Sequence, residues 1–234
     1  MAAQRPPKSR RSPPASPLAG AVARAVEGTR SSARLPVAPA ATGTTASPTT
    51  DKREAIVDAA LELFSEKGFD GTAVPAIAER AGVGAGTIYR YFESKEAIVN
   101  VLFKRYKSLL AQRLLTGLPM EAPPREQFHW FWTRAMGFAR DYPRALAFLE
   151  LHHHGAYLDE ESRMLEENLL APAWAFLAAT HDAGVTKPVS PRVLGHLVWG
   201  AFVGLAKASW IGQIALDAAT IAASEDCCWD AIRR

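Results

Sequence analysis

Apolar residues recur at helical spacing through most of this chain, and one stretch combines two such patterns with a glycine-rich break. In residues 72–96, a first apolar pattern centres on Ile77 and a second on Ile88. Gly82-Val83-Gly84 lies between them, where glycines allow the backbone a positive φ. Two short helices joined by such a turn predict a helix-turn-helix over residues 73–92, whose second helix would lie in the major groove of DNA.

The second helix of this pattern has an outer face suited to close approach. If Ile88, Tyr91 and Phe92 face inward, the opposite side is short, small and capable of hydrogen bonding, and it carries no acidic residue before Glu93. Nothing on it would therefore repel phosphate. This face consists of Ala85, Gly86, Thr87, Tyr89 and Arg90.

The motif and the helix before it resemble the DNA-binding domain of TetR-type transcriptional regulators. The match runs in register over about 45 residues, which is more specific than a lone short motif. The alternative is a helical hairpin in a protein core with no nucleic-acid partner. The matching residues are Ala59-Ala60, Leu63-Phe64, Gly68-Phe69, Thr72, Ile77-Ala78, Ala81-Gly82-Val83, Gly86-Thr87-Ile88-Tyr89, Tyr91-Phe92 and Ser94-Lys95-Glu96.

The resemblance implies roles for individual residues. Thr87 and Tyr89 would reach base edges, with Ala85 and Gly86 packed against the groove. The residues expected to hold phosphates, which set register and carry little sequence information, are Thr72, Arg90, Tyr91 and Lys95.

Two positions depart from the pattern of many relatives. Ala73 and Gly84 stand where a side-chain oxygen often caps a helix, so we expect direct base readout to be sparse. More weight would then fall on Arg90 and on DNA shape.

The helices that flank the motif are also predicted. Asp51, with Glu54 three residues later, forms a capping box that predicts the start of a first helix, and Gly68 would end it. This gives a three-helix head over residues 51–97. Ser94 would cap a fourth helix that runs to about residue 115, and the resemblance implies that its movement carries ligand binding to the motif.

The remainder, residues 98–234, is predicted to be a helical regulatory and dimerisation body. No strand-like alternation occurs, so the whole fold is expected to be all-α, with a helix-turn-helix head and a helical bundle. The helices expected in the body beyond the fourth helix span about 124–141, 143–155, 159–182, 190–212 and 217–232.

Aromatic residues crowd the body, which fits either core packing or a pocket between helices for an apolar or aromatic small molecule. The resemblance favours a pocket that some of them line. The residues we assign to it are Trp130, Phe148, His152 and Trp174.

The last two helices are expected to pair with their twins in a homodimer, as the resemblance implies. The nearly uncharged run from Val193 to Ala206 contains Gly200 and Gly204, which allow close helix packing. The alternative is a helix buried in the core of the monomer. The predicted interface residues are Val193, Leu197, Phe202, Leu205, Trp229 and Ile232.

The histidine run at residues 152–154 does not predict a metal site. Consecutive helical residues point about 100° apart, so three in a row cannot converge on one ion. We predict neither a metal nor a cofactor. The only cysteines, Cys227 and Cys228, are adjacent, and such sparse cysteine usage fits a reducing cytoplasm.

Residues 1–50 differ from the rest in composition. They are rich in Pro, Ala, Ser, Thr and Arg, and carry seven basic residues against one glutamate, a net charge of +6. The other residues carry 20 basic and 23 acidic side chains, a net −3, so the overall +3 comes from this tail. We predict disorder here. The tail is either a basic arm for DNA, a transit peptide, which a prokaryotic family argues against, or sequence without a role.

Together these patterns predict a cytoplasmic transcriptional regulator rather than an enzyme. We expect a homodimeric repressor on a palindromic double-stranded operator, released by a small apolar or aromatic effector, with half-sites about 34–36 Å apart. No apolar run is long enough to span a membrane. The alternatives are a DNA-binding adaptor without an effector and a metal-dependent helical hydrolase.

Overall fold

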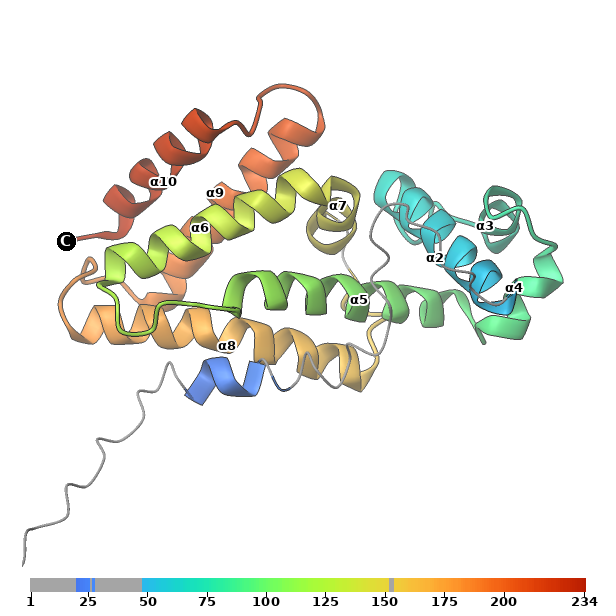
Figure 1. The fold of residues 1–234 in the computed structure, drawn as a ribbon, viewed down its shortest axis with the longest axis horizontal. Helices are drawn as coiled ribbons and strands as arrows, with labels where there is room; N and C mark the ends of the chain where they lie inside the picture. The colour runs from blue at the N-terminus through green and yellow to red at the C-terminus, as the bar shows by residue number, and fades with distance from the viewer. Residues whose placement is uncertain (1–19, 26, 28–47, 152–153) are drawn as a thin grey trace, which may run out of the picture.

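The structure, a computed structural model, is built from helices, as the sequence predicts (Figure 1). The only extended pairing among the described residues is an isolated bridge between Thr186 and Arg233. The all-α fold is therefore confirmed. The residues that the structure describes are 20–25, 27, 48–151 and 154–234.

Three helices form the head, at one end of the molecule (Figure 1): α2 (Pro48–Lys67), α3 (Val74–Arg80) and α4 (Ala85–Tyr91). They pack around side chains that are almost completely buried, including Phe64, Ile77 and Ile88. The first helix begins at Pro48, not at the predicted cap Asp51. A proline fits the first turn because the N–H that it lacks would have no helical partner there.

Helix α5 (Lys95–Leu115) joins the head to the body and runs along the body's length (Figure 1). Its predicted cap is present, since Ser94 Oγ accepts a hydrogen bond from the Ala97 N–H at 3.2 Å. Its residues therefore contact the head at one end and the bundle at the other.

Five further helices complete the body: α6 (Pro124–Asp141), α7 (Pro143–Leu151), α8 (Glu160–Asp182), α9 (Pro191–Trp210) and α10 (Ala218–Ile232). Four of them match the predicted spans within two residues. The exception is α7, which the apolar pattern extended to residue 155. His154 lies outside the helix and buries its ring instead.

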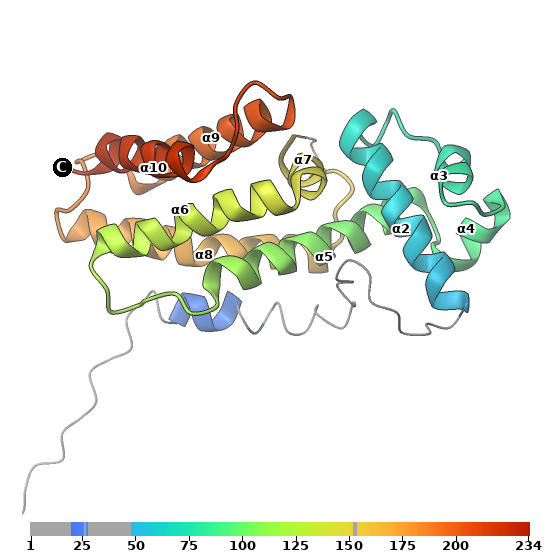
Figure 2. The same cartoon turned by 45° about the horizontal axis from the view of Figure 1, so that its top comes forward.

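Four helices of the body, α5, α6, α9 and α8, pack in a ring in which each lies against the next. α5 lies against both α6 and α8, and α9 packs against α6 and α8 on another side. α10 lies beside α6 and α9, with α9 and α10 together forming one outer side of the bundle (Figure 2). The short helix α7 packs against α2, so it connects body and head directly.

One part of the tail departs from the predicted disorder. Residues 20–25 are helical, and both Ala21 and Ala25 are buried. Two alanines four residues apart form a narrow apolar stripe, which is too small to appear as a helical pattern in the sequence. The other residues of the tail before Pro48, Glu27 apart, lie outside the described residues.

Candidate nucleic-acid interface and ligand cavity

The turn between α3 and α4 depends on one glycine. Gly82 has a φ of +66°, a conformation that residues with side chains rarely adopt. The Val83 N–H then donates to the Ala78 carbonyl at 2.9 Å and closes the turn. Gly84 has an ordinary extended backbone with a φ of −69°, so only the first of the two glycines takes the expected positive φ.

The inner side of α4 is held by Ile88, which is buried against the core of the head. Neither α3 nor α4 has a side-chain cap, as Ala73 and Gly84 predict. The angle of α4 is thus determined by apolar packing and by the turn at Gly82.

The outer side of α4 is open to solvent. Tyr89 is 59% exposed, the largest exposed fraction of any large hydrophobic side chain in the described chain. A Cβ added at Gly86 would meet nothing within 4 Å. The helix contains no acidic residue and one arginine, so its surface suits a polyanion. The predicted residues that α4 carries at or partly at the surface are Ala85, Gly86, Thr87, Tyr89, Arg90 and Tyr91.

Thr72 does not lie on this surface, contrary to the prediction of a phosphate contact. Its side chain is buried, and its hydroxyl donates to the Gly68 carbonyl at 2.8 Å, with the Leu63 carbonyl at 3.3 Å. The hydroxyl therefore satisfies the end of α2 and is not available to a ligand.

Lys95 is also directed inward, which corrects its predicted phosphate role. Its ammonium donates to the Phe69 carbonyl at 2.7 Å and to the Thr72 carbonyl at 2.9 Å, and it lies 3.8 Å from the centre of the Phe69 ring. A cation over an aromatic face is attracted by the ring quadrupole. Lys95 thus fixes the loop between α2 and α3 to the start of α5.

A cavity of about 270 Å³ lies within the body, between α5, α6, α8 and α9. Most of its wall is apolar, and much of that is aromatic. Cavities of this size with a few polar groups are the usual form of small-molecule sites. The aromatic residues in the wall are Phe128, Phe131, Trp132, Trp174, Phe176, Trp199 and Phe202.

Of the four residues predicted to line a pocket, Trp174 lines the cavity. Trp130 lies outside its wall, because its indole donates to the Leu114 carbonyl at 2.9 Å and its ring stacks under Arg134. Phe148 is fully buried and packs on Phe64, between body and head. His152 lies outside the described residues.

One end of the cavity is charged. Lys107 is only 4% exposed, and its ammonium lies 3.2 Å from Glu150 Oε1 and 3.1 Å from Glu166 Oε1. Burial by itself lowers the pKa of this ammonium, but the two carboxylates outweigh burial and raise the pKa above its usual value. Trp199 Nε1 donates to Glu150 Oε2 at 3.1 Å and completes the cluster.

The sequence contained a signal for this charged end that our prediction did not use. Lys107 falls in line with Phe103, Leu110 and Leu114 at helical spacing, so it stands on the buried face of α5. A lysine on an apolar face requires a buried partner. Glu150 and Glu166 come from other helices, and helical spacing alone could not identify them.

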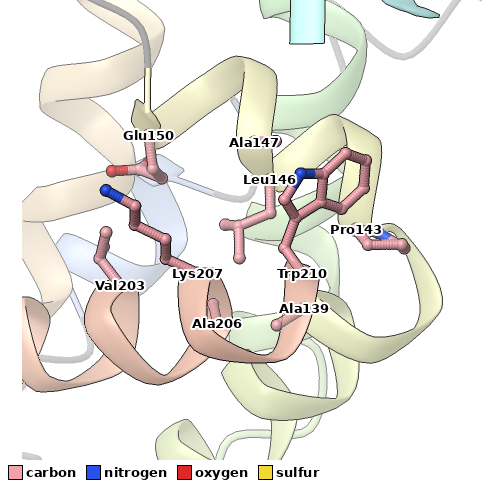
Figure 3. A pocket seen from close by; sticks show the side chains of 9 residues that line it. All are labelled: Ala139, Pro143, Leu146, Ala147, Glu150, Val203, Ala206, Lys207 and Trp210. Carbon is pink, nitrogen blue, oxygen red and sulfur yellow. The ribbon is translucent and has the colours of Figure 1, made fainter. Parts of the chain in front are cut away.

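A second hollow adjoins the outer side of Glu150 and is much too small for a ligand. Its volume is about 10 Å³, which is about the space of one water molecule. Trp210 and Lys207 of α9 line it, and Lys207 extends its amino group toward Glu150 (Figure 3). The large cavity is therefore the better ligand site.

Ion pairs and hydrogen bonds connect α5 to the head. Arg105 Nη2 donates to Glu54 Oε2 of α2 at 2.6 Å. Asn100 donates to the Tyr157 carbonyl at 2.8 Å and accepts from the Asp159 N–H at 2.8 Å, which ties α5 to the start of α8. Movement of α5 would therefore disturb both ends of this network.

The predicted dimer residues divide into two groups. Val193 and Leu197 of α9 are 49% and 58% exposed, and Leu205 is half-buried. A Cβ added at Gly200 or Gly204 would meet nothing within 4 Å, so this side of α9 is open.

The other three predicted dimer residues are internal, which corrects their assignment. Phe202, Trp229 and Ile232 belong to the core of the monomer, with exposed fractions of 1%, 9% and 0%. They lie on the sides of α9 and α10 that face α6 and each other, and so cannot line an outer surface.

The histidines take separate positions. His129 Nδ1 lies 2.7 Å from Glu225 Oε2 at the surface, and His154 is buried near the Phe148 carbonyl. Within the described part of the chain, no three His, Cys, Asp or Glu side chains come together as a metal site. His152 and His153 lie outside that part.

We also find that none of the described helices combines the length and apolar character needed to cross a bilayer.

Comparison with protein families gives two matches. Residues 56–102 match the model for bacterial regulatory proteins of the tetR family, and residues 103–234 match the model for a tetracyclin repressor-like C-terminal domain. The boundary between the two matches falls within α5.

Similar individual proteins agree with these matches. The HTH-type transcriptional regulator RutR of Escherichia coli K12 is 31% identical over 158 residues, 64% of this chain and 71% of RutR. The HTH-type transcriptional repressor KstR2 of Rhodococcus jostii is 34% identical over 79 residues, 30% of this chain and 39% of that protein. The solved structure of a TetR family protein from Vibrio parahaemolyticus superposes with a TM-score of 0.59 at 30% identity, covering 78% of this chain and 99% of that one.

Proposed function

The chain belongs to the TetR family of bacterial regulatory proteins, as its sequence predicts, and we propose that it is a homodimeric repressor released from its operator by a ligand in the cavity. It is a DNA-binding transcriptional regulator, and its family is regulatory rather than catalytic. The observation that carries the proposal is the position of one helix, α5. It begins just after α4, whose outer side is exposed and free of acidic residues, and farther along it lines the apolar cavity.

We assign the reading of DNA to α4. Tyr89 and Thr87 reach base edges, and Gly86 allows the backbone to approach the groove, because nothing occupies the space beside it. Arg90 and Tyr91 hold phosphates. Thr72 and Lys95 are left out of this assignment, since their polar groups are engaged within the head.

We propose that the effector acts through α5. Lys107, Leu110 and Leu114 face the cavity, whereas Arg105 on the same helix pairs with Glu54 of the head. A ligand that shifts α5 would change the position of α2 and α4. It can do this only by its difference in affinity for the two arrangements, and DNA must weaken ligand binding to the same degree.

Substitution of Tyr89 tests the reading helix. The full-length chain can be used to enrich sheared genomic DNA from its host. We expect it to recover one or a few palindromic sites. We expect Tyr89→Ala to raise the Kd for such a site about tenfold, as the loss of one base-edge contact would. Because Tyr89 is exposed, its thermal unfolding should not change.

Met164→Ala provides the matched control. Met164 is 54% exposed on α8, outside the helix-turn-helix, and its truncation should leave operator binding unchanged. Equal affinities of wild-type protein and Tyr89→Ala would contradict the assignment of α4. Weak, uniform recovery of all fragments would instead indicate an adaptor that binds without reading sequence.

We propose that the open side of α9 is the dimer interface. The support is its exposed apolar residues and the empty space beside Gly200 and Gly204. Leu197→Asp should convert the dimer to a monomer in sedimentation, because it places a charge in an apolar contact. Met164→Asp is the control, and a dimer that persists in Leu197→Asp would exclude this face.

A further inference from the structure

The charged residues in the wall of the cavity, Lys107, Glu150 and Glu166, lie together at one end. On α8 its wall runs from Glu166 to Leu177, a distance of about 16 Å along the helix axis. On α5 it runs from Lys107 to Leu114 in the same way, starting from a charge and ending in apolar residues. A ligand that fills this space therefore has a polar group at one end and an apolar remainder.

The charged end has more carboxylates than ammonium groups. Lys107 is the one cation that the cavity wall supplies from its described residues, and it stands between Glu150 and Glu166. His196 also lines the cavity, in its other part near Trp174. An anionic group of a ligand at this end would have to compete with two carboxylates for one ammonium.

The two carboxylates differ in how many polar partners their oxygens have. Glu150 has Lys107 at Oε1 and the Trp199 indole at Oε2, and Lys207 extends toward it from the small hollow (Figure 3). Glu166 has Lys107 at Oε1 as its ion partner within the described chain. Glu166 is therefore the carboxylate with capacity for another cation.

The apolar part of the wall also suits a cation. Phe131, Trp174 and Trp199 present aromatic rings to the cavity, and ring faces attract cations as well as apolar groups. We infer that the effector is a hydrophobic amine or a related organic cation. Its charged group would lie beside Glu166 and its apolar part among the aromatic residues. This holds only if the cavity is the effector site proposed above.

Three probes of one shape and different charge test this inference. 4-Phenylbutylamine is a cation at pH 7, 4-phenylbutanol is neutral and 4-phenylbutyrate is an anion. In calorimetric titrations of the full-length protein, we expect the amine to bind about tenfold more tightly than the alcohol, and the butyrate to bind most weakly. Tighter binding of the butyrate, or no binding of the amine, would overturn the inference.

A charge-removing variant gives the sharper test. Glu166→Gln keeps the shape of the wall, so the alcohol should bind as before while the preference for the amine disappears. Glu167→Gln is the matched control, because Glu167 is the next residue and is exposed to solvent. A preference for the amine that survives Glu166→Gln would show that Glu166 does not select the ligand.

Release of operator DNA is measured separately, so that the two proposals can fail independently. If the amine binds through Glu166 but does not release the enriched DNA fragment, the ligand chemistry is supported and the effector role is wrong. If binding does release DNA, the Glu166→Gln variant should keep its operator affinity and lose its response to the amine.

Discussion

The head and the body each hold a lysine by internal contacts, partly buried in the head and fully buried in the body, and they use different partners. Lys95 in the head lies over the Phe69 ring and donates to two backbone carbonyls. Lys107 in the body lies between the carboxylates of Glu150 and Glu166. Neutral partners hold Lys95, which connects the loop after α2 to the start of α5. Lys107 belongs instead to a charged cluster at the wall of the cavity.

The two regions also differ in where their functional surface comes from. The proposed reading face of the head comes from one helix, α4, and its residues point outward. The cavity of the body collects residues from α5, α6, α7, α8 and α9 and points inward. The head is thus a local feature of the chain, and the ligand site is a property of its tertiary structure.

Removal of Lys107 should have the largest effect on stability. Lys107→Ala leaves Glu150 buried beside Glu166 without their cation, and breaking such a pair costs about 3–5 kcal/mol. We expect about 3 kcal/mol in denaturant unfolding, the low end of that range, because the cavity can admit water.

A double variant separates charge from packing. Lys107→Met with Glu150→Gln removes both charges and leaves Glu166, which is partly exposed, without a buried neighbour of its own sign. This variant should be clearly more stable than Lys107→Met alone, which keeps the same volume but leaves the Glu150 carboxylate buried without its cation. If the two are equally unstable, the unpaired carboxylate is not the cause of the loss, and the contrast between Lys95 and Lys107 disappears.

Much of the fold follows from local patterns. The break at Gly82, the cap at Ser94 and the apolar stripes predict the helices of the head and body within a few residues. The end of α7 was missed, because His154 has the spacing of a helical residue but packs in the tertiary structure. The predicted cap at Asp51 is wrong, because the helix already begins at Pro48, about one turn earlier.

The site residues were predicted well where helical spacing determines them and poorly where tertiary contacts do. The outer face of α4 depends on helical spacing, and its five residues are exposed or, in the case of Thr87, partly exposed. Lys95 and Phe202 were misplaced, since their side chains face residues distant in the sequence, and Thr72 was misplaced because its hydroxyl bonds backbone carbonyls at the end of α2. No local pattern could indicate that Trp174 lines a cavity while Trp130 does not.

A glycine in the body should respond strongly to an added methyl group. A Cβ at Gly195 would stand 2.5 Å from the Trp174 ring and 2.9 Å from Leu177, where α9 meets α8 beside the cavity. We expect Gly195→Ala to lower the unfolding free energy by about 1–3 kcal/mol, the usual cost of overpacking. It should also weaken binding of 4-phenylbutylamine, since Trp174 must move into the cavity. Unchanged ligand affinity would place the ligand elsewhere.

A glycine in the head should respond in the opposite way and with a smaller effect on stability. Gly86 lies in the first turn of α4, and a Cβ there meets nothing, so Gly86→Ala should change the unfolding free energy by no more than about 0.5–1 kcal/mol, in the stabilising direction. Its cost should appear only with DNA, because the methyl group would occupy the space between the helix backbone and the groove. Operator affinity measured beside thermal unfolding should therefore fall while the protein becomes no less stable. Should operator affinity stay the same, the backbone of α4 does not approach DNA at Gly86, and the space beside it has no part in recognition.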